Sequence, residues 1–101
     1  MRILVFFDLP VQTGEDRRNY TRFRKHLIKS GFVMVQESVY SKLVLNASSA
    51  NAVIENVRKN KAPSGIIQMM TVTEKQYAKM EFVAGESQSQ VLDSDERLIV
   101  I

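Results

Sequence analysis

The chain opens with a run of apolar side chains between Arg2 and Asp8, and these side chains fall on both faces of an extended segment. Such a run is typical of a strand at the centre of a sheet that is covered on both sides. Thr13, followed three residues later by Asp16, predicts the N-terminus of a helix. Gly31 is expected to close that helix after about 16 residues.

The apolar positions of this first helix lie on one side of it. At about 100° per residue, Tyr20, Phe23 and Leu27 fall within a narrow arc, which predicts the face that packs on the sheet. Ile28 lies at the border of that arc.

The spacing of apolar residues in the segments that follow predicts two strands, a helix and a further strand. Residues 32–36 and 39–45 are rich in β-branched and aromatic side chains and predict an antiparallel hairpin. Ser48 or Ser49 is expected to cap a second helix that runs to about residue 60, and residues 66–73 predict a fourth strand. The order of these elements, βαββαβ, predicts an α+β fold of the ferredoxin-like pattern.

The C-terminal part of the chain contains segments beyond the six elements of a minimal ferredoxin-like fold. Residues 74–83 predict a short helix, residues 85–90 a polar linker, and residues 97–101 a final apolar strand. A strand on a linker can pair with its own sheet or bury an exposed sheet edge of a second protomer, and we favour the second arrangement. We therefore expect a domain at 1–84, and a linker and strand at 85–101 that packs on the partner protomer of a homodimer.

The composition limits the class of protein. With 101 residues, 45% hydrophobic and 25% charged, the chain predicts a single folded domain. The lack of cysteine excludes disulfides and thiolate metal sites. No signal-peptide pattern is present and the longest apolar run is five residues, so we expect a cytoplasmic protein that does not enter a membrane.

Positive charge is concentrated in the first helix. Six of the 14 Lys and Arg residues lie between Arg17 and Lys29. Arg18, Arg22, Lys25 and Lys29 project within about 60° of one another, nearly opposite the apolar arc, and Arg17 and Arg24 flank them. A row of like charges is neutralised well by a phosphate backbone, although many charged helix faces are simply solvated. The scarcity of acids after Asp16 favours nucleic-acid binding.

Asp8 is the candidate for chemistry, because it ends an apolar strand just before a turn. One carboxylate binds a hard cation poorly, but two copies meeting across a dimer axis could hold Mg²⁺. The alternative is that Asp8 only stops the strand and caps the turn. No phosphate-binding glycine loop or activated-serine motif is present, and the single histidine, His26, is expected to be a solvated helix residue.

Two short motifs indicate a family. Phe7-Asp8, continued by Leu9-Pro10, and the segment Gln36 to Tyr40 resemble the CRISPR-associated protein two family, the small subunit of the spacer-adaptation machinery. The resemblance covers nearly the whole chain. The Asp-Leu-Pro continuation, the length and the tail are similar to members from type II systems, which have a single-protein effector nuclease.

The resemblance implies a homodimer with exchanged C-terminal strands that bridges two dimers of the CRISPR integrase, the first CRISPR-associated protein. In that setting double-stranded DNA is bound without sequence reading, and its phosphates are contacted by Arg17, Arg18, Arg22, Lys25 and Lys29.

The resemblance also implies a rival function, a Mg²⁺-dependent endonuclease acting on RNA or duplex DNA with Asp8 as catalytic and metal-binding residue. Many members have tyrosine where this chain has Phe7, and the missing hydroxyl argues for weak hydrolysis. A third interpretation, a regulatory module that binds a small molecule, has no supporting residues in the sequence.

Overall fold

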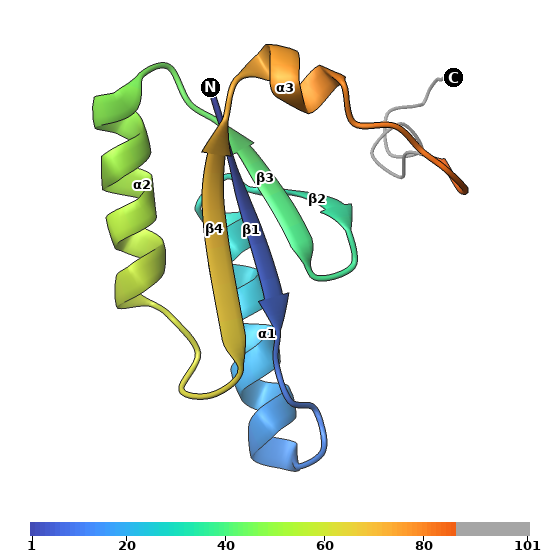
Figure 1. Cartoon of the computed structure of the whole chain (residues 1–101). Helices are drawn as coiled ribbons and strands as arrows, with labels where there is room; N and C mark the ends of the chain where they lie inside the picture. The colour runs from blue at the N-terminus through green and yellow to red at the C-terminus, as the bar shows by residue number, and fades with distance from the viewer. Residues whose placement is uncertain (87–101) are drawn as a thin grey trace.

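The computed structural model describes residues 1–86, which form one α+β domain (Figure 1). The elements are β1 (Arg2–Asp8), α1 (Gly14–Lys29), β2 (Val33–Gln36), β3 (Val39–Leu43), α2 (Ala47–Lys59), β4 (Ile66–Val72) and α3 (Glu74–Ala78). The predicted order βαββαβ and the ferredoxin-like class are confirmed, with strand ends that differ from the predicted ones by one or two residues.

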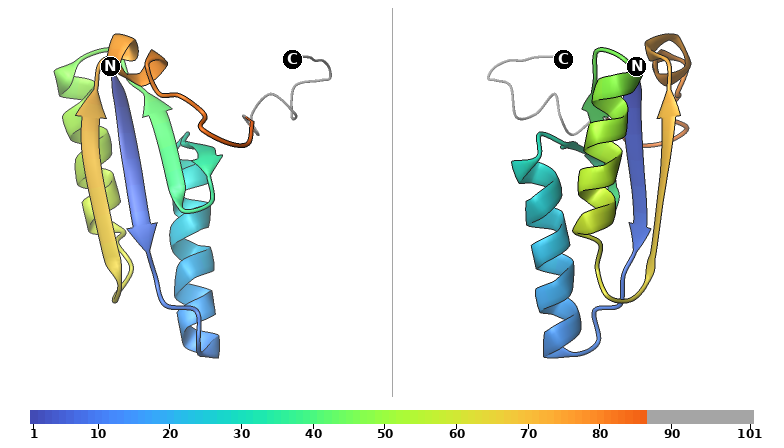
Figure 2. Two further views of the ribbon diagram at one scale, coloured as in Figure 1. Left: turned by 45° about the vertical axis from the view of Figure 1, so that its right-hand side comes forward. Right: turned by 90° about the vertical axis from the view of Figure 1, so that its left-hand side faces the viewer.

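The four strands form an antiparallel sheet in the order β2-β3-β1-β4, so β1 is central as predicted. Both long helices lie on one face of the sheet (Figure 2). Side chains alternate along β1, which places Ile3, Val5 and Phe7 against the helices. The predicted helix stripe meets them there, with Phe23 and Leu27 buried. The core therefore lies between this face and the two helices.

The expectation that both faces of the sheet are covered is wrong for the part of the chain that the structure describes. No long helix lies on the second face, which we call the open face. The register places apolar side chains from all four strands on it, and several are more than half exposed. These exposed side chains are Val33, Leu43, Ile66 and Met70. On this face Leu4 of β1 is buried within one copy, whereas the exposed side chains belong to β2, β3 and β4.

Helix α1 begins and ends where the sequence predicted. The Thr13 side chain accepts a hydrogen bond from the Asp16 amide at 3.0 Å, and the Asp16 carboxylate accepts one from the Thr13 amide at 3.2 Å. This reciprocal pair satisfies two backbone donors that a helix start leaves free. Gly31 follows the last turn at a φ of 96°, a conformation that glycine adopts at low cost.

The predicted cap of α2 is wrong. Asn46 caps this helix, because its Oδ1 accepts a hydrogen bond from the Ser49 amide at 2.9 Å. The helix therefore begins at Ala47, and Ser48 and Ser49 lie in its first turn. Asparagine and serine are equally good helix caps, so the residue type alone does not favour either serine over Asn46. The position at which β3 ends places Asn46 at the start of the helix.

The short helix after β4 is confirmed but covers only Glu74–Ala78. The predicted final strand at 97–101 lies outside the described residues, as does most of the predicted 85–101 segment. Within the described part, no helix is both long and apolar enough to span a bilayer.

Candidate nucleic-acid interface and cation site

Asp8 is the last residue of β1, and its side chain is exposed on the open face. Its neighbour Phe7 points the other way, into the core, where its ring stacks on Tyr40 at 5.7 Å and meets Phe23 edge to face at 5.2 Å. Such aromatic packing holds the strand end rigidly. Phe7 therefore fixes the backbone position from which the Asp8 side chain projects.

The backbone around Asp8 is held from both sides of the strand. On the β3 side, the Phe7 amide donates a hydrogen bond to the carbonyl of Ser38 at 3.0 Å. Ser38 has a φ of 68°, a conformation that non-glycine residues rarely adopt. On the β4 side, Gly65 lies so close that a Cβ atom there would be 2.7 Å from the Asp8 carbonyl oxygen. Asp8 therefore has a fixed position.

The chemistry around Asp8 allows a cation only if further ligands come from outside residues 1–86 of one copy. Asp8 lines a hollow with Ser38 and Gln68, whose side chains offer neutral oxygens. Among the described residues, no group of three or more His, Cys, Asp or Glu side chains could hold a metal ion. A carboxylate with neutral oxygens suits Mg²⁺, which usually keeps several waters and takes one or two carboxylates. Asp8 from a second copy would supply the second carboxylate.

The basic residues of α1 lie on its solvent side, as predicted. The side chains of Arg17, Arg18, Arg22, Lys25 and Lys29 are all exposed, and we call this set the basic ridge. Four of them surround one shallow hollow together with Gly14 and Thr21, whereas Lys29, in the last turn, lies outside it.

None of the basic-ridge charges is neutralised within residues 1–86. The ion pairs of this region are Arg2–Glu74 and Arg58–Glu55, and neither involves α1. Arg17 donates to the carbonyl oxygens of Val11 and Gln12 at 3.3 Å each, which fixes its side chain without cancelling its charge. Arg22 donates to Asn19 Oδ1 at 3.1 Å. The ridge is therefore available to an anionic partner.

The structure does not bring Asp8 and the basic ridge together in one copy. The ridge faces away from the sheet on the helical side, and Asp8 lies on the open face. The hollows that they line share no residue.

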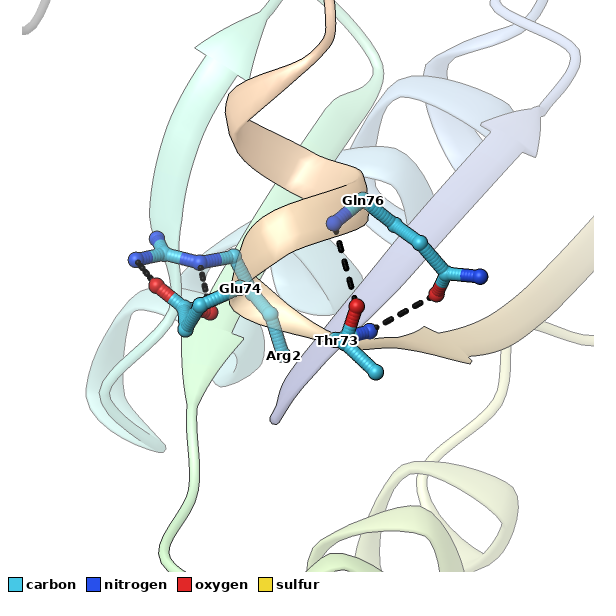
Figure 3. A network of polar contacts seen from close by, with 4 residues as sticks. All are labelled: Arg2, Thr73, Glu74 and Gln76. Carbon is cyan, nitrogen blue, oxygen red and sulfur yellow. Dashed lines mark hydrogen bonds and ion pairs between the residues drawn. The ribbon is translucent and has the colours of Figure 1, made fainter.

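Sequence reasoning missed the anchoring of α3, which Figure 3 shows. Arg2 donates two hydrogen bonds to the Glu74 carboxylate, at 2.9 and 2.7 Å, and its guanidinium lies 4.2 Å from the centroid of the Tyr77 ring. The hydrogen bonds from Arg2 lower the pKa of Glu74 and raise that of Arg2. Arg2 and Glu74 are 72 positions apart, so no local pattern could have paired them.

His26 differs from the expected solvated residue. It is half-buried, and its Nε2 lies 3.4 Å from Ser30 Oγ and from Asn56 Nδ2. Because Asn56 is on α2, this cluster joins the two helices. Asn56 and Ser30 are also hydrogen bonded, at 3.3 Å.

Comparisons with known proteins agree on a family. The family model described as CRISPR associated protein Cas2 matches residues 1–80. A protein of Treponema denticola named CRISPR-associated endoribonuclease Cas2 is 58% identical over 101 residues, covering all of both chains. A protein of the same name from Streptococcus mutans is 45% identical and covers all of this chain and 93% of its own length.

A solved structure agrees on the fold. The crystal structure of Streptococcus pyogenes Cas2 at pH 6.5 superposes with a TM-score of 0.62 at 16% sequence identity. The match covers 83% of this chain and all of that one.

Proposed function

Because the chain belongs to the CRISPR associated protein Cas2 family, we propose that it acts in spacer acquisition as a DNA-binding subunit that bridges two dimers of the CRISPR integrase. The observation that carries this proposal is the basic ridge, whose charges have no acidic partner in the described chain. From Arg18 to Lys29 it extends about 16 Å along the helix, enough to follow several phosphates of a duplex. Contacts to phosphates fix DNA without reading its sequence, as a protein that stores foreign DNA requires.

The proposed bridge is a homodimer, and the open face supports it. This face gathers exposed apolar side chains from β2, β3 and β4, which is the kind of surface that a second copy buries. The exchange of residues 97–101 between protomers remains part of the proposal. The proposed setting is a type II system, as the continuation of Asp8 by Leu9 and Pro10 predicts.

A second function, a Mg²⁺-dependent endonuclease centred on Asp8, has its own support. The Asp8 carboxylate is exposed on a rigid strand end, and the relatives named above are called endoribonucleases. A bound cation would polarise a phosphodiester and activate a water there. The chain's part would be to present the Asp8 carboxylate beside Ser38 and Gln68, with Phe7 fixing the strand end.

Charge reversal on the ridge tests the bridging function. The double variant Arg18→Glu and Arg22→Glu is expected to weaken binding to a duplex of about 30 base pairs by at least tenfold and to lower the salt dependence of log K by about 2. The matched control reverses two exposed charges at the end of α2, Lys59→Glu and Lys61→Glu. Fluorescence titration over a salt series, with and without the integrase, measures both, and normal binding by the ridge variant would refute the proposal.

Removal of the carboxylate separates the two functions. Asp8→Ala is expected to leave duplex binding, integrase binding and spacer acquisition intact under the bridging function, because Asp8 and the ridge lie on opposite faces. Loss of spacer acquisition in this variant, together with loss of Mg²⁺-dependent cleavage of RNA or duplex DNA, would instead establish the nuclease as the function.

A further inference from the structure

A third hollow lies beside the basic ridge, and its lining residues come from α1, from β2 and β3, and from the turn that joins these two strands. Its volume is about 480 Å³, within the range of small-ligand pockets. Its lining includes Tyr20, Thr21, Arg24, Met34, Glu37 and Tyr40. Thr21 also lines the hollow of the basic ridge, so the two hollows are neighbours along α1.

The walls of this hollow differ in chemistry from the ridge. Tyr20 and Met34 are half-buried, so part of each side chain is exposed in the hollow, whereas Tyr40 is only 1% exposed and contributes almost no accessible surface. The ring of Tyr20 is fixed edge to face against Phe7 at 5.8 Å. A flat ring can pack on such a surface, whereas a phosphate gains nothing from it.

The polar groups at the rim supply both a donor and an acceptor. Arg24 from α1 and Glu37 from the turn line the same hollow, yet the ion pairs of residues 1–86 do not include them. Arg24 is also half-buried. A guanidinium and a carboxylate that do not pair with each other leave both available to one ligand with acceptors and donors on its edge.

The turn that supplies Glu37 is held in place by its neighbour. Ser38 has the positive φ described above, and its carbonyl accepts the hydrogen bond of the Phe7 amide. Rare backbone conformations persist where surrounding contacts fix them, and they are frequent at binding sites. The acceptor side of the hollow is therefore preformed.

We propose that this hollow binds one unpaired nucleobase of a strand whose phosphates lie on the basic ridge. A nucleobase has apolar faces and an edge of donors and acceptors, which matches the partly exposed Tyr20 and Met34 side chains and the Arg24 and Glu37 rim. The proposal deepens the proposed function and rests on it, because the ridge holds the adjoining phosphates. It adds a preference for DNA with an unpaired nucleotide over a fully paired duplex.

Two duplexes that differ by a single central unpaired nucleotide test the preference. The wild-type protein is expected to bind the bulged duplex about fivefold to tenfold more tightly, since stacking on side chains is gained without breaking a base pair. Arg24→Gln and Glu37→Gln are each expected to bring the ratio of the two affinities close to one. The matched control, Arg18→Gln on the ridge, is expected to weaken both complexes and leave the ratio unchanged.

Nucleoside monophosphates probe the hollow without any duplex. Amide resonances of Thr21, Arg24 and Glu37 are expected to shift on titration with them, and these shifts are expected to vanish in Glu37→Gln. Equal affinity for the two duplexes together with absent shifts would overturn the inference and leave the bridging function standing. Shifts without any duplex binding would refute the bridging function and support the hollow alone.

Discussion

At the scale of single residues, Asp8 is positioned by its neighbours and not by contacts of its own carboxylate. Phe7 fixes the strand through its ring and its amide, and Gly65, just before β4, packs against the Asp8 carbonyl. The carboxylate itself remains exposed. This arrangement gives a fixed backbone with a free functional group, which is what a binding residue requires.

Gly65→Ala tests this packing. Its Cβ would lie 2.7 Å from both the Asp8 carbonyl oxygen and Leu9 Cδ2, at a φ of 94° that alanine adopts poorly. We expect a loss of about 2 to 3 kcal/mol in the free energy of unfolding, measured by urea denaturation. Gly85→Ala is the control, because Gly85 has a similar φ of 84° but no atom within 4 Å. Equal losses in the two variants would show that backbone strain alone is responsible.

The residue-scale predictions succeeded where chemistry is local and failed where it depends on the fold. The Thr13 cap and the exposure of the basic ridge follow from spacings within one helix. The choice of Asn46 over the two serines depended on where β3 ends, which the sequence marks weakly. The hollow beside the ridge joins α1 to a turn that comes well after it, and it could not be read from either segment alone.

At the scale of elements, α3 is attached to β1 by one side chain. Arg2 bonds to Glu74 and lies over the Tyr77 ring, and the reciprocal Thr73–Gln76 hydrogen bonds define the start of the helix. A five-residue helix has little stability of its own. Its position therefore depends on the ion pair.

Acid is expected to release α3. The hydrogen bonds from Arg2 hold the pKa of Glu74 below its ordinary value of 4.5, so the attachment is complete above that pH and is lost as the pH falls through the lowered pKa. Amide hydrogen exchange of residues 74–78 is expected to accelerate between about pH 5 and pH 3 relative to α1 and after correction for intrinsic rates. In Glu74→Gln this pH dependence should be absent, and a protected α3 at pH 3 in the wild type would contradict the dependence.

At the scale of the whole molecule, the described residues form two layers, a sheet and the helices on one of its faces. The sequence pattern of β1 had predicted a third layer on the second face. Helices cover one face of the sheet, and the open face presents apolar side chains to its surroundings. The pattern of β1 predicted cover on both faces. Within residues 1–86 the helices cover one face, and on the other face Leu4 is buried while side chains of β2, β3 and β4 stay exposed. A sequence pattern records burial in the assembled molecule, so it does not distinguish cover by the same chain from cover by a partner.

Leu43→Glu tests the open face as the dimer interface. Leu43 is 58% exposed in one copy, so the variant is expected to fold, while a buried unpaired charge is expected to weaken the dimer at least tenfold. The control, Leu45→Glu, changes a leucine that is 93% exposed in the loop before α2 and is expected to stay dimeric. Light scattering after size exclusion gives both masses, and a dimeric Leu43→Glu would place the interface elsewhere.

Because the sheet separates Asp8 from the basic ridge, the two sites can change independently of each other in evolution. Substitutions at the strand end leave the solvent side of α1 untouched, and charge changes along α1 leave the strand end untouched. Natural selection can therefore relax on one side of the sheet while it remains strict on the other. Under the two proposed functions, a lineage that no longer needs cleavage can lose Asp8 and still keep the basic ridge that is proposed to bind DNA.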